Sequence, residues 1–516
     1  MRQSIHVLFF SFQLVLSQAA LAALPQPVAT VHGQLQGTAT EMTGMALFRG
    51  VPYAAAPVGA NRWREPQAVS AWAGVRQATE FAARCVQGGF APGAEQPLTS
   101  EDCLYLNIWT PADTAAAALP VLIWIHGGGF FTGSGSADIY DGEALASKGA
   151  VVITLNYRLG SFGFLAHPEL SAESPNHSSG NYGMLDVLAA VKWVKENIAA
   201  FGGDPDRITL MGESAGGNVV ANLVASPLST GLFQRAILQS GAWMGWGGIT
   251  RQPTLAEREV IGAGLVSAYG AASIAELRQA STQAVFENIP AAGSTMNVDG
   301  YLLPRDSSLI FAEGTQQPVD VLAGSNRDEG VFFGPGIQEA DAFRTYARNK
   351  FATLSERFLE LYPATSDAVA NASYLSAYTN ELAWQLRKMG TFQSGRGRAA
   401  WLYFFTHVPP GQEARGATHV AELPYMFNHA DQNPNWTDLD RQLADQMSSY
   451  WVNFAATGNP NAAGLPAWPE PKDNVPGGVL VLGDEVTAET LQVPGANVLE
   501  LFDAAFQQHL QTLGGR

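Results

Sequence analysis

A serine between glycines is the feature of this sequence most suited to chemistry. Ser214 lies in the run 212–216 (GESAG), which fits the pattern Gly-x-Ser-x-Gly. Apolar residues 207–211 (RITLM) precede this run, and residues 217–223 (GNVVANL), which can be helical, follow it. A nucleophilic serine in a tight turn between a strand and a helix requires this context, with small flanking residues that let the backbone segments pass closely. The helix N-terminus would then direct N–H groups towards a reacting carbonyl.

A serine hydroxyl needs a general base, and an acidic side chain must orient that base. In the expected arrangement the chain order is serine, acid, histidine. Four histidines lie well downstream of the serine: His407, His419, His429 and His509. His407 ends a predicted strand and His509 lies in a predicted C-terminal helix. His419 lies in a loop, where catalytic residues concentrate, so this position is favoured, with His429 close behind.

The acid is expected after a strand between the serine and the histidine. Residues 319–323 (VDVLA) are typical of a buried strand, and residues 324–330 (GSNRDEG) follow as a loop with two adjacent carboxylates. The pattern alone does not choose between Asp328 and Glu329, and an ordinary acidic surface loop is the alternative.

A glycine triplet provides a candidate oxyanion hole. The run 126–130 (HGGGF) directly follows the predicted strand 120–125 (PVLIWI). Successive glycines expose backbone N–H groups, which the oxyanion of a tetrahedral intermediate requires. A phosphate-binding loop is the rival interpretation, but the run lacks the Lys-Ser/Thr of a P-loop and the Gly-x-Gly-x-x-Gly spacing.

Several nearly continuous apolar runs must form the elements that position these residues. Such runs predict strands of a parallel sheet that is covered on both faces. A helical pattern at 184–200 lies between two of them, so strands and helices alternate. We predict an α/β fold with a large, mostly parallel sheet, built as a single domain over 23–516 with long insertions. The predicted strands are 120–125, 151–156, 207–211, 235–239, 319–323 and 400–405.

The composition favours a large buried core and excludes some partners. Of 516 residues, 47% are hydrophobic and 15% are charged. The formal net charge of −17 disfavours nucleic acid, because a binder must neutralise phosphates with Lys and Arg. The same charge disfavours an anionic membrane surface.

The N-terminus resembles a signal peptide. Arg2 gives a positive start, residues 7–16 (VLFFSFQLVL) are apolar, and residues 20–22 (ALA) offer a cleavage site. The apolar run is too short to span a bilayer comfortably, so we expect no stable membrane anchor; a first core helix or an anchor is the alternative. We therefore predict removal of residues 1–22 and a periplasmic or secreted protein. Export favours a disulfide between the two cysteines, Cys85 and Cys103, over two unrelated buried thiols.

Four further motifs make the chain similar to the type-B carboxylesterase family, which includes para-nitrobenzyl esterases, animal carboxylesterases and cholinesterases. The resemblance covers nearly the whole mature chain. Its most specific part is the run 100–109 (SEDCLYLNIW). The other three motifs are 48–54 (FRGVPYA), 201–205 (FGGDP) and 457–460 (TGNP).

The resemblance implies an α/β-hydrolase fold and a serine-dependent carboxylic ester hydrolase that uses neither metal nor cofactor. It implies Glu329, not Asp328, as the acid of a triad with Ser214, and His419 as the base, since this histidine begins the family motif His-x-x-Glu-Leu-Pro-Tyr. Cys85 and Cys103 match the first disulfide of the family. The implied oxyanion donors are the N–H groups of Gly128, Gly129 and Ala215.

The substrate is expected to be a small-molecule ester. Cholinesterases hold a quaternary ammonium with a tryptophan inside the disulfide loop, where this chain has only Phe90, so choline esters are not expected. A lipase, an amidase and a non-catalytic binding protein of the same fold are the alternatives, and the oligomeric state stays open. Side chains near the motifs could line a substrate pocket, with ordinary core positions as the alternative: Glu213, Phe130, Trp243, Trp246, Phe332 and Phe333.

Overall fold

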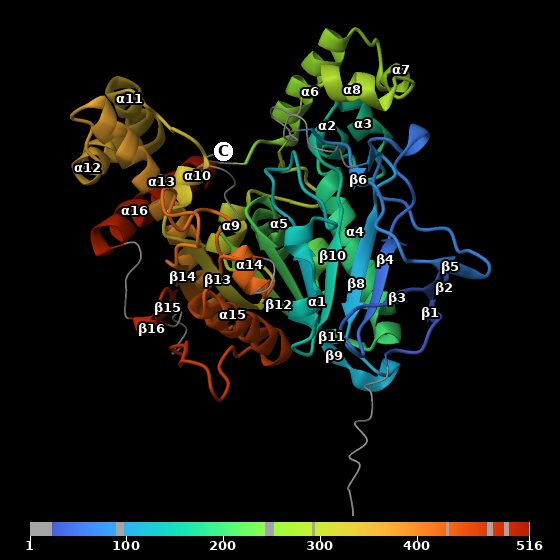
Figure 1. Ribbon diagram of the computed structural model, residues 1–516. Coiled ribbons are helices and arrows are strands. Elements are labelled where there is room, and N and C mark those ends of the chain that lie inside the picture. The colour runs from blue at the N-terminus through green and yellow to red at the C-terminus, as the bar shows by residue number, and fades with distance from the viewer. Residues whose placement is uncertain are drawn as a thin grey trace, which may run out of the picture.

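Figure 1 shows the computed structural model of the chain. It describes residues 23–88, 98–242, 252–290, 295–429, 433–471, 478–489 and 495–514. The predicted signal peptide (1–22) lies outside the described residues, as do Phe90, Trp243 and Trp246.

An eleven-stranded sheet forms the centre of the molecule, in the order β16-β15-β14-β13-β12-β11-β9-β10-β8-β4-β3. All six predicted strands are confirmed and pair in parallel with their neighbours among themselves. The predicted α/β class with a mostly parallel sheet is therefore confirmed. The parallel strands are β9 (Leu119–Ile125), β10 (Val151–Leu155), β11 (Gly203–Glu213), β12 (Arg235–Gln239), β13 (Asp320–Asn326), β14 (Ala400–Phe405) and β15 (Val479–Leu482).

Antiparallel strands complete both edges of this sheet. At one edge lies β16 (Val486–Glu489), and at the other lie β8 (Tyr105–Thr110), β4 (Ala46–Pro52) and β3 (Thr38–Ala39). Two small sheets lie outside it: β1 (Val28–Thr30), β2 (Gly33–Gln36) and β5 (Val75–Gln77), and the pair β6 (Arg84–Cys85) and β7 (Thr99–Ser100).

Strand β11 is longer than the predicted 207–211. Gly212 pairs with Leu238 and Glu213 pairs with Gln239, so the ladder with β12 continues to the residue before Ser214. The glycine in this run therefore belongs to the strand and not to the turn, and the turn begins only at the serine.

Helices cover both faces of the sheet (Figure 1). Alternate residues of β9 enter two separate cores, Val121 and Ile123 on one face and Leu122 and Trp124 on the other, as the two-residue period of a strand requires. The first core contains residues of α4 (Tyr182–Asn197), α5 (Ala215–Ala225) and α13 (Asp367–Ser394). The second contains residues of α1 (Glu143–Ala146), α14 (Leu423–Met426) and α15 (Asp438–Thr457).

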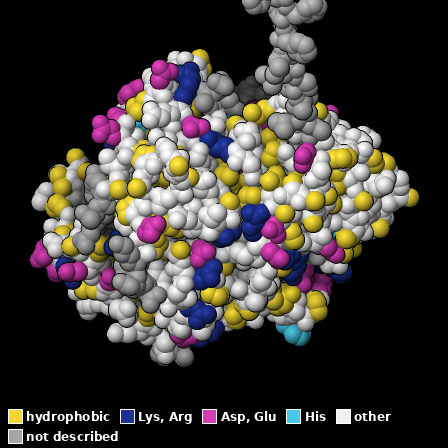
Figure 2. Space-filling model, turned by 90° about the horizontal axis from the view of Figure 1, so that it is seen from below, with side chains coloured by type: hydrophobic (Ala, Val, Ile, Leu, Met, Phe, Trp, Pro, Cys, Tyr) yellow, Lys and Arg dark blue, Asp and Glu magenta, His cyan; other side chains and the backbone are white. Residues whose placement is uncertain are grey.

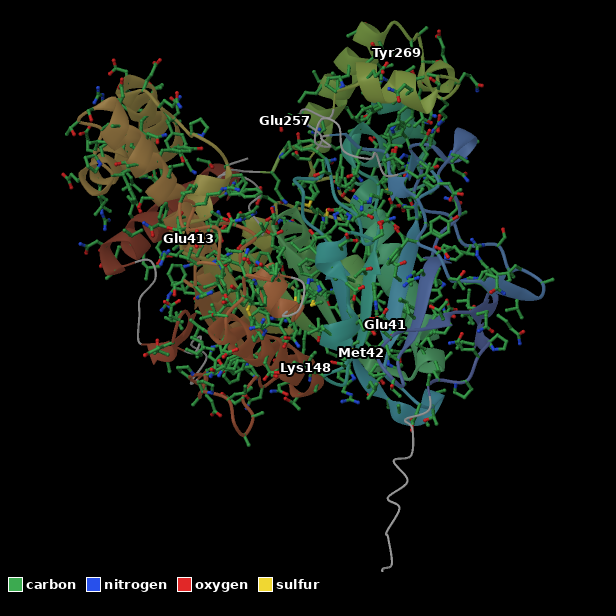
Figure 3. All side chains as sticks on the ribbon, viewed as in Figure 1. Glu41, Met42, Lys148, Glu257, Tyr269 and Glu413 are labelled. Atoms are coloured by element: carbon green, nitrogen blue, oxygen red, sulfur yellow. A yellow bond between two sulfur atoms is a disulfide. The ribbon has the colours of Figure 1, made fainter. Side chains whose placement is uncertain are left out.

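Helical insertions extend from this body as two lobes at the top of Figure 1. One lobe contains α6 (Leu255–Tyr269), α7 (Ile274–Leu277) and α8 (Thr282–Asn288) beside α2 (Gly160–Phe164) and α3 (Pro168–Glu173); Glu257 and Tyr269 are labelled on α6 in Figure 3. The other contains α10 (Glu329–Phe332), α11 (Ala340–Phe351) and α12 (Ser355–Leu361) at one end of α13. The remaining helices are α9 (Ser307–Ala312) and α16 (Ala496–Gly514).

The predicted disulfide between Cys85 and Cys103 is present and links residues 18 positions apart. A bridge around a loop of this length contributes about 3 kcal/mol in the chain-entropy account. On the face shown in Figure 2, side chains of both charges are interspersed with apolar ones. The net negative charge therefore does not appear there as a single acidic patch.

Candidate active site

Ser214 occupies a strained turn between β11 and α5. Its backbone angles are φ 56° and ψ −123°, which few residues other than glycine adopt. The close packing around it explains the flanking glycines. A Cβ atom on Gly216 would overlap the carbonyl oxygen of Ile125, and one on Gly212 would overlap Gly216 itself. The sharp turn that the sequence pattern predicts is thus present.

Parallel strands bring the other predicted residues to the same edge of the sheet. Strands β9, β11, β12 and β13 are adjacent and parallel, so the segments that follow their carboxyl ends meet there. These segments begin with His126, Ser214, Ser240 and Arg327, and the loop after β14 carries His419 to the same place.

The structure joins His419 to Glu329. The ring nitrogen Nδ1 of His419 lies 2.5 Å from Glu329 Oε2, and both side chains are buried. Asp328, the adjacent carboxylate, instead accepts a hydrogen bond from the N–H of Ala417 and pairs with Arg327. Of these two carboxylates, Glu329 is therefore the one positioned to orient an imidazole.

The other downstream histidines have different partners. His407 lies between the carboxylates of Asp440 and Asp484, at 2.8 and 2.7 Å. His429 Nε2 donates a hydrogen bond to the carbonyl of Asp141. His509 is buried in α16. Among the described contacts, none of these three histidines reaches Glu329.

The second ring nitrogen of His419 faces the residue that precedes the serine. Nε2 lies 3.2 Å from Glu213 Oε1, but neither atom has a hydrogen-bond partner within the part of the chain that the structure describes. No described hydrogen bond joins Ser214 Oγ to His419 either. A buried nitrogen of this kind is free to accept a proton from a nearby hydroxyl, and hydrogen bonds in empty active sites are often longer than in the reacting complex.

Burial and charge act in opposite directions on this histidine. Burial lowers the pKa of His419, but the carboxylates of Glu213 and Glu329 raise it to about 9. Burial also raises the pKa of Glu213 well above that of an ordinary glutamate, and the nearby carboxylates of Glu422 and Glu329 add to this effect. The group of buried carboxyls around His419 therefore holds protons more tightly than isolated side chains would.

Supporting hydrogen bonds fix the acid in place. Ser240 Oγ donates to Glu329 Oε1 at 2.6 Å, and the N–H of Asn326 donates to the same oxygen at 2.8 Å. Ser240 ends up there because it follows β12 directly, and its φ of 48° turns the chain at that point. Sequence reasoning missed both residues. Ser240 directly follows the predicted strand 235–239, and Asn326 ends β13, which continues three residues beyond the predicted 319–323 into the expected loop.

A second buried acid, Glu422, was also missed, although it is part of the recognised histidine motif. The side-chain amides of Asn326 and Gln239 donate to its two oxygens, at 2.5 and 3.0 Å. Burial raises the pKa of Glu422 to about 7. Trp451 Nε1 donates to Gln239, so this network connects the histidine loop to β12, β13 and α15.

The predicted oxyanion donors lie in two adjoining segments. Gly128 and Gly129 have φ angles of 96° and 64°, and Ala215 is the first residue of α5. Among the described hydrogen bonds, the N–H groups of these three residues have no acceptor. A Cβ atom on Gly127, the preceding residue, would come within 3.0 Å of Ser214 Cβ, so the glycine loop passes directly beside the serine.

Two of the predicted pocket aromatics lie beside the predicted base. The rings of Phe332 and Phe333 lie 5.1 and 4.8 Å from the ring of His419, beside the predicted base. Phe130 is buried and packs on Phe164 at 5.1 Å, and its role in substrate contact stays a prediction. Trp243 lies outside the described residues.

Within the described ranges, no group of three or more acidic, histidine or cysteine side chains could hold a metal ion. Over the same ranges, no helix has both the length and the apolarity needed to cross a membrane.

Comparisons with known proteins identify the family of this chain. Residues 25–494 match the carboxylesterase family. The chain belongs to this family. It is 38% identical to a fumonisin B1 esterase of Sphingopyxis macrogoltabida over 89% of this chain and 88% of that protein. It is 37% identical to a para-nitrobenzyl esterase of Bacillus subtilis (strain 168), covering 90% of this chain and 96% of that protein.

Solved structures show the same likeness in three dimensions. A PNB esterase structure superposes with a TM-score of 0.80 at 31% identity, covering 92% of this chain and 99% of that chain. This carboxylesterase-family chain therefore has the predicted α/β-hydrolase fold, and it is a carboxylic ester hydrolase.

Proposed function

We propose that Ser214, His419 and Glu329 form the catalytic triad of this esterase and that hydrolysis proceeds through an acyl-enzyme on Ser214. The observation that carries the proposal is the geometry of His419. One ring nitrogen is bound to buried Glu329. The other is buried, has no hydrogen-bond partner among the described residues and lies 3.2 Å from Glu213 Oε1, next to Ser214 in the chain. A general base oriented by an acid has this arrangement.

In the proposed mechanism, His419 Nε2 takes the hydroxyl proton as Ser214 Oγ attacks the ester carbonyl. The tetrahedral oxyanion accepts hydrogen bonds from the N–H groups of Gly128, Gly129 and Ala215. The intermediate collapses, its bond to the alcohol oxygen breaks, and His419 gives its proton to the leaving alcohol. Water, deprotonated by His419, then attacks the acyl-enzyme, and the carboxylic acid is released with Ser214 restored.

The first test replaces Ser214 by Ala. With para-nitrophenyl acetate, we expect the pre-steady-state burst of nitrophenol to disappear and kcat to fall by at least about 10⁴-fold, because the acyl acceptor is lost. An organophosphate probe should label the wild type and not this variant. Ser267→Ala, at an exposed serine of α6, serves as the matched control and should retain the burst. Near-wild-type turnover by Ser214→Ala would overturn the proposal.

The substrate class that we propose is small carboxylic esters, because the curated relatives named above are esterases. A panel of esters, amides and long-chain glycerides would separate this activity from that of an amidase or a lipase.

We also propose that residues 1–22 are removed on export, so that the enzyme acts in the periplasm or outside the cell. The apolar run at 7–16 and the Cys85–Cys103 disulfide support this proposal, since disulfides persist in oxidising compartments. N-terminal sequencing of protein recovered from each cell fraction tests it. Full-length protein confined to the cytoplasm would contradict export.

A further inference from the structure

A pocket of about 380 Å³ lies beside the loop that carries His419. Three of its lining residues, Thr418, Val420 and Ala421, flank this histidine in the chain. Phe332 also lines the pocket, and its ring packs on the imidazole at 5.1 Å. Neither of two other hollows of similar size, about 320 and 350 Å³, is lined by residues of this loop or by Phe332. This pocket therefore adjoins the proposed general base.

The wall of the pocket is mainly apolar, with Ile139, Pro409 and Trp436 among its residues. Its volume and lining suit an organic group rather than an ion alone. Arg415 is the one charged side chain of this lining, and no acidic residue belongs to the lining that the structure describes. His429 also lines the pocket, but burial lowers the pKa of its ring, which therefore stays neutral at neutral pH.

The guanidinium of Arg415 has no carboxylate partner among the described ion pairs and hydrogen bonds. Glu413, in the same loop (Figure 3), instead accepts a hydrogen bond from the N–H of Gly411 and does not line the pocket. Gln412 and Thr418 line the pocket too, and no described hydrogen bond occupies their side-chain donors. In a protein with a net charge of −17, one cationic side chain without an acidic neighbour in the lining favours an anionic group at this place.

The position of the pocket determines which half of an ester would enter it. His419 must deliver its proton to the leaving alcohol oxygen, so the alcohol lies on the histidine side of the scissile bond. The acyl carbonyl oxygen lies at the other side, over Gly128, Gly129 and Ala215. The lining of the pocket includes Phe332 and the chain neighbours of His419, but not His419, Ser214 or the oxyanion glycines, so the pocket lies on the alcohol side of the substrate and away from the oxyanion hole.

We propose that this pocket binds the alcohol part of the substrate and that Arg415 selects esters whose alcohol carries a carboxylate. The inference rests on the proposed function of Ser214 and His419. Hydrolysis of such an ester releases the acyl group as a carboxylic acid and the alcohol as a hydroxycarboxylate, so the charge that Arg415 contacts is unchanged by the reaction. A guanidinium can bind this carboxylate in a bidentate manner, with neutral donors at its side.

The test compares two acetate esters of para-substituted phenols. One phenol is para-hydroxyphenylpropanoate, and the other has a carboxamide in place of the carboxylate, so only the charge on the alcohol part differs. We expect the wild type to prefer the carboxylate in kcat/KM, and Arg415→Gln to lower this preference by about 10-fold, as loss of a charge-assisted contact does. The preference should also fall with rising salt, because the contact is exposed to solvent.

Arg348→Gln removes an exposed arginine of α11 that does not line the pocket, and it should leave the substrate preference as in the wild type. Titration with an organophosphate probe gives the concentration of active enzyme in every sample, so a partly unfolded variant is corrected for. If Arg415→Gln, corrected for its concentration of active enzyme, keeps the wild-type preference for the carboxylate substrate, the inference is wrong. It is also wrong if the variant loses activity only on the phenyl ester of succinate, where the carboxylate lies on the acyl side.

The two proposals fail in different ways. Burst kinetics retained by Ser214→Ala would contradict the proposed triad. A titratable, active esterase that does not distinguish the carboxylate from the carboxamide would contradict only the role of Arg415.

Discussion

The predicted general base faces the residue before the nucleophile, since His419 Nε2 lies 3.2 Å from Glu213 Oε1. Both side chains are buried, so water screens their interaction little. The proton that His419 holds is therefore stabilised from two sides, by Glu213 at Nε2 and by Glu329 at Nδ1.

This contact predicts a pH effect. A base acts only when neutral, so kcat/KM should rise with pH until His419 has lost its proton, and the nearby carboxylates raise the pKa of His419 to about 9. In its ionised form Glu213 raises the pKa of His419, so Glu213→Gln should move the rising limb of the pH profile to lower pH. Stopped-flow or initial-rate profiles would measure the shift. A rising limb that stays in place or moves to higher pH would contradict the effect of this contact. Glu41→Gln, at an exposed glutamate, is the control and should leave the pH profile unchanged.

The glycine loop predicts a steric effect on the oxyanion hole. Gly128→Ala would place a Cβ atom against the backbone carbonyl of Thr132, so the loop must shift and its N–H groups would lose their direction. We expect kcat to fall by about 10²- to 10³-fold, the loss typical of one oxyanion donor.

Gly74→Ala is the matched control for the loop. Gly74 also has a positive φ, of 75°, but a Cβ atom there meets nothing within 4 Å. This variant carries a similar backbone strain and should keep its activity. Equal losses in kcat for the two variants would attribute the effect to general strain and not to the loop.

Ser240 is expected to act as a positioning residue for the acid. Ser240→Ala removes the hydroxyl that donates to Glu329 Oε1 and leaves the N–H of Asn326 as a remaining donor to that oxygen. The loss of one hydrogen bond of two should lower kcat by roughly 3- to 10-fold. KM should change little, because Ser240 contacts the acid and not the substrate. A rise in KM without a change in kcat would contradict this role.

The lowered pKa of Asp440 predicts a contribution to stability that depends on pH. Burial raises the pKa of Asp440, but hydrogen bonds from Thr437, Tyr425 and His407 lower it to about 2. A carboxyl whose pKa is lower in the folded than in the unfolded state stabilises the fold above the unfolded value. This stabilisation is lost as the pH falls through the folded value.

The variant Asp440→Asn should therefore reduce the free energy of unfolding at pH 7 by roughly 1–3 kcal/mol, with a smaller difference as the pH falls from about 4 towards 2. Urea denaturation at several pH values would measure it. Asp438→Asn, at an exposed carboxylate of the same helix turn, should cost under about 1 kcal/mol. A loss for Asp440→Asn that is the same at every pH would exclude the charge as its cause.

Local sequence determined the elements and the chemical groups. Continuous apolar runs indicated the strands of a parallel sheet. Gly212 and Gly216 indicated a turn at Ser214, which only small flanking residues permit. The run 126–130 likewise indicated a loop of exposed N–H groups. These features depend on residues that are neighbours in the chain, so their type and spacing suffice to predict them. The resemblance to the carboxylesterase family then indicated Glu329 over Asp328 as the acid and His419 among the downstream histidines as the base.

Only the tertiary structure decided which distant groups meet. Ser240 lies 89 positions from Glu329, and Glu329 lies 90 positions from His419. These contacts depend on the order of the parallel strands, because the segments that follow adjacent strands meet at one edge of the sheet. The same holds for Glu213, which reached His419 because β11 continues to the residue before the nucleophile, and for Arg415, which a long loop brings to the pocket beside His419. No local pattern encodes these distances, because each depends on how the strands and helices of the whole sheet pack together.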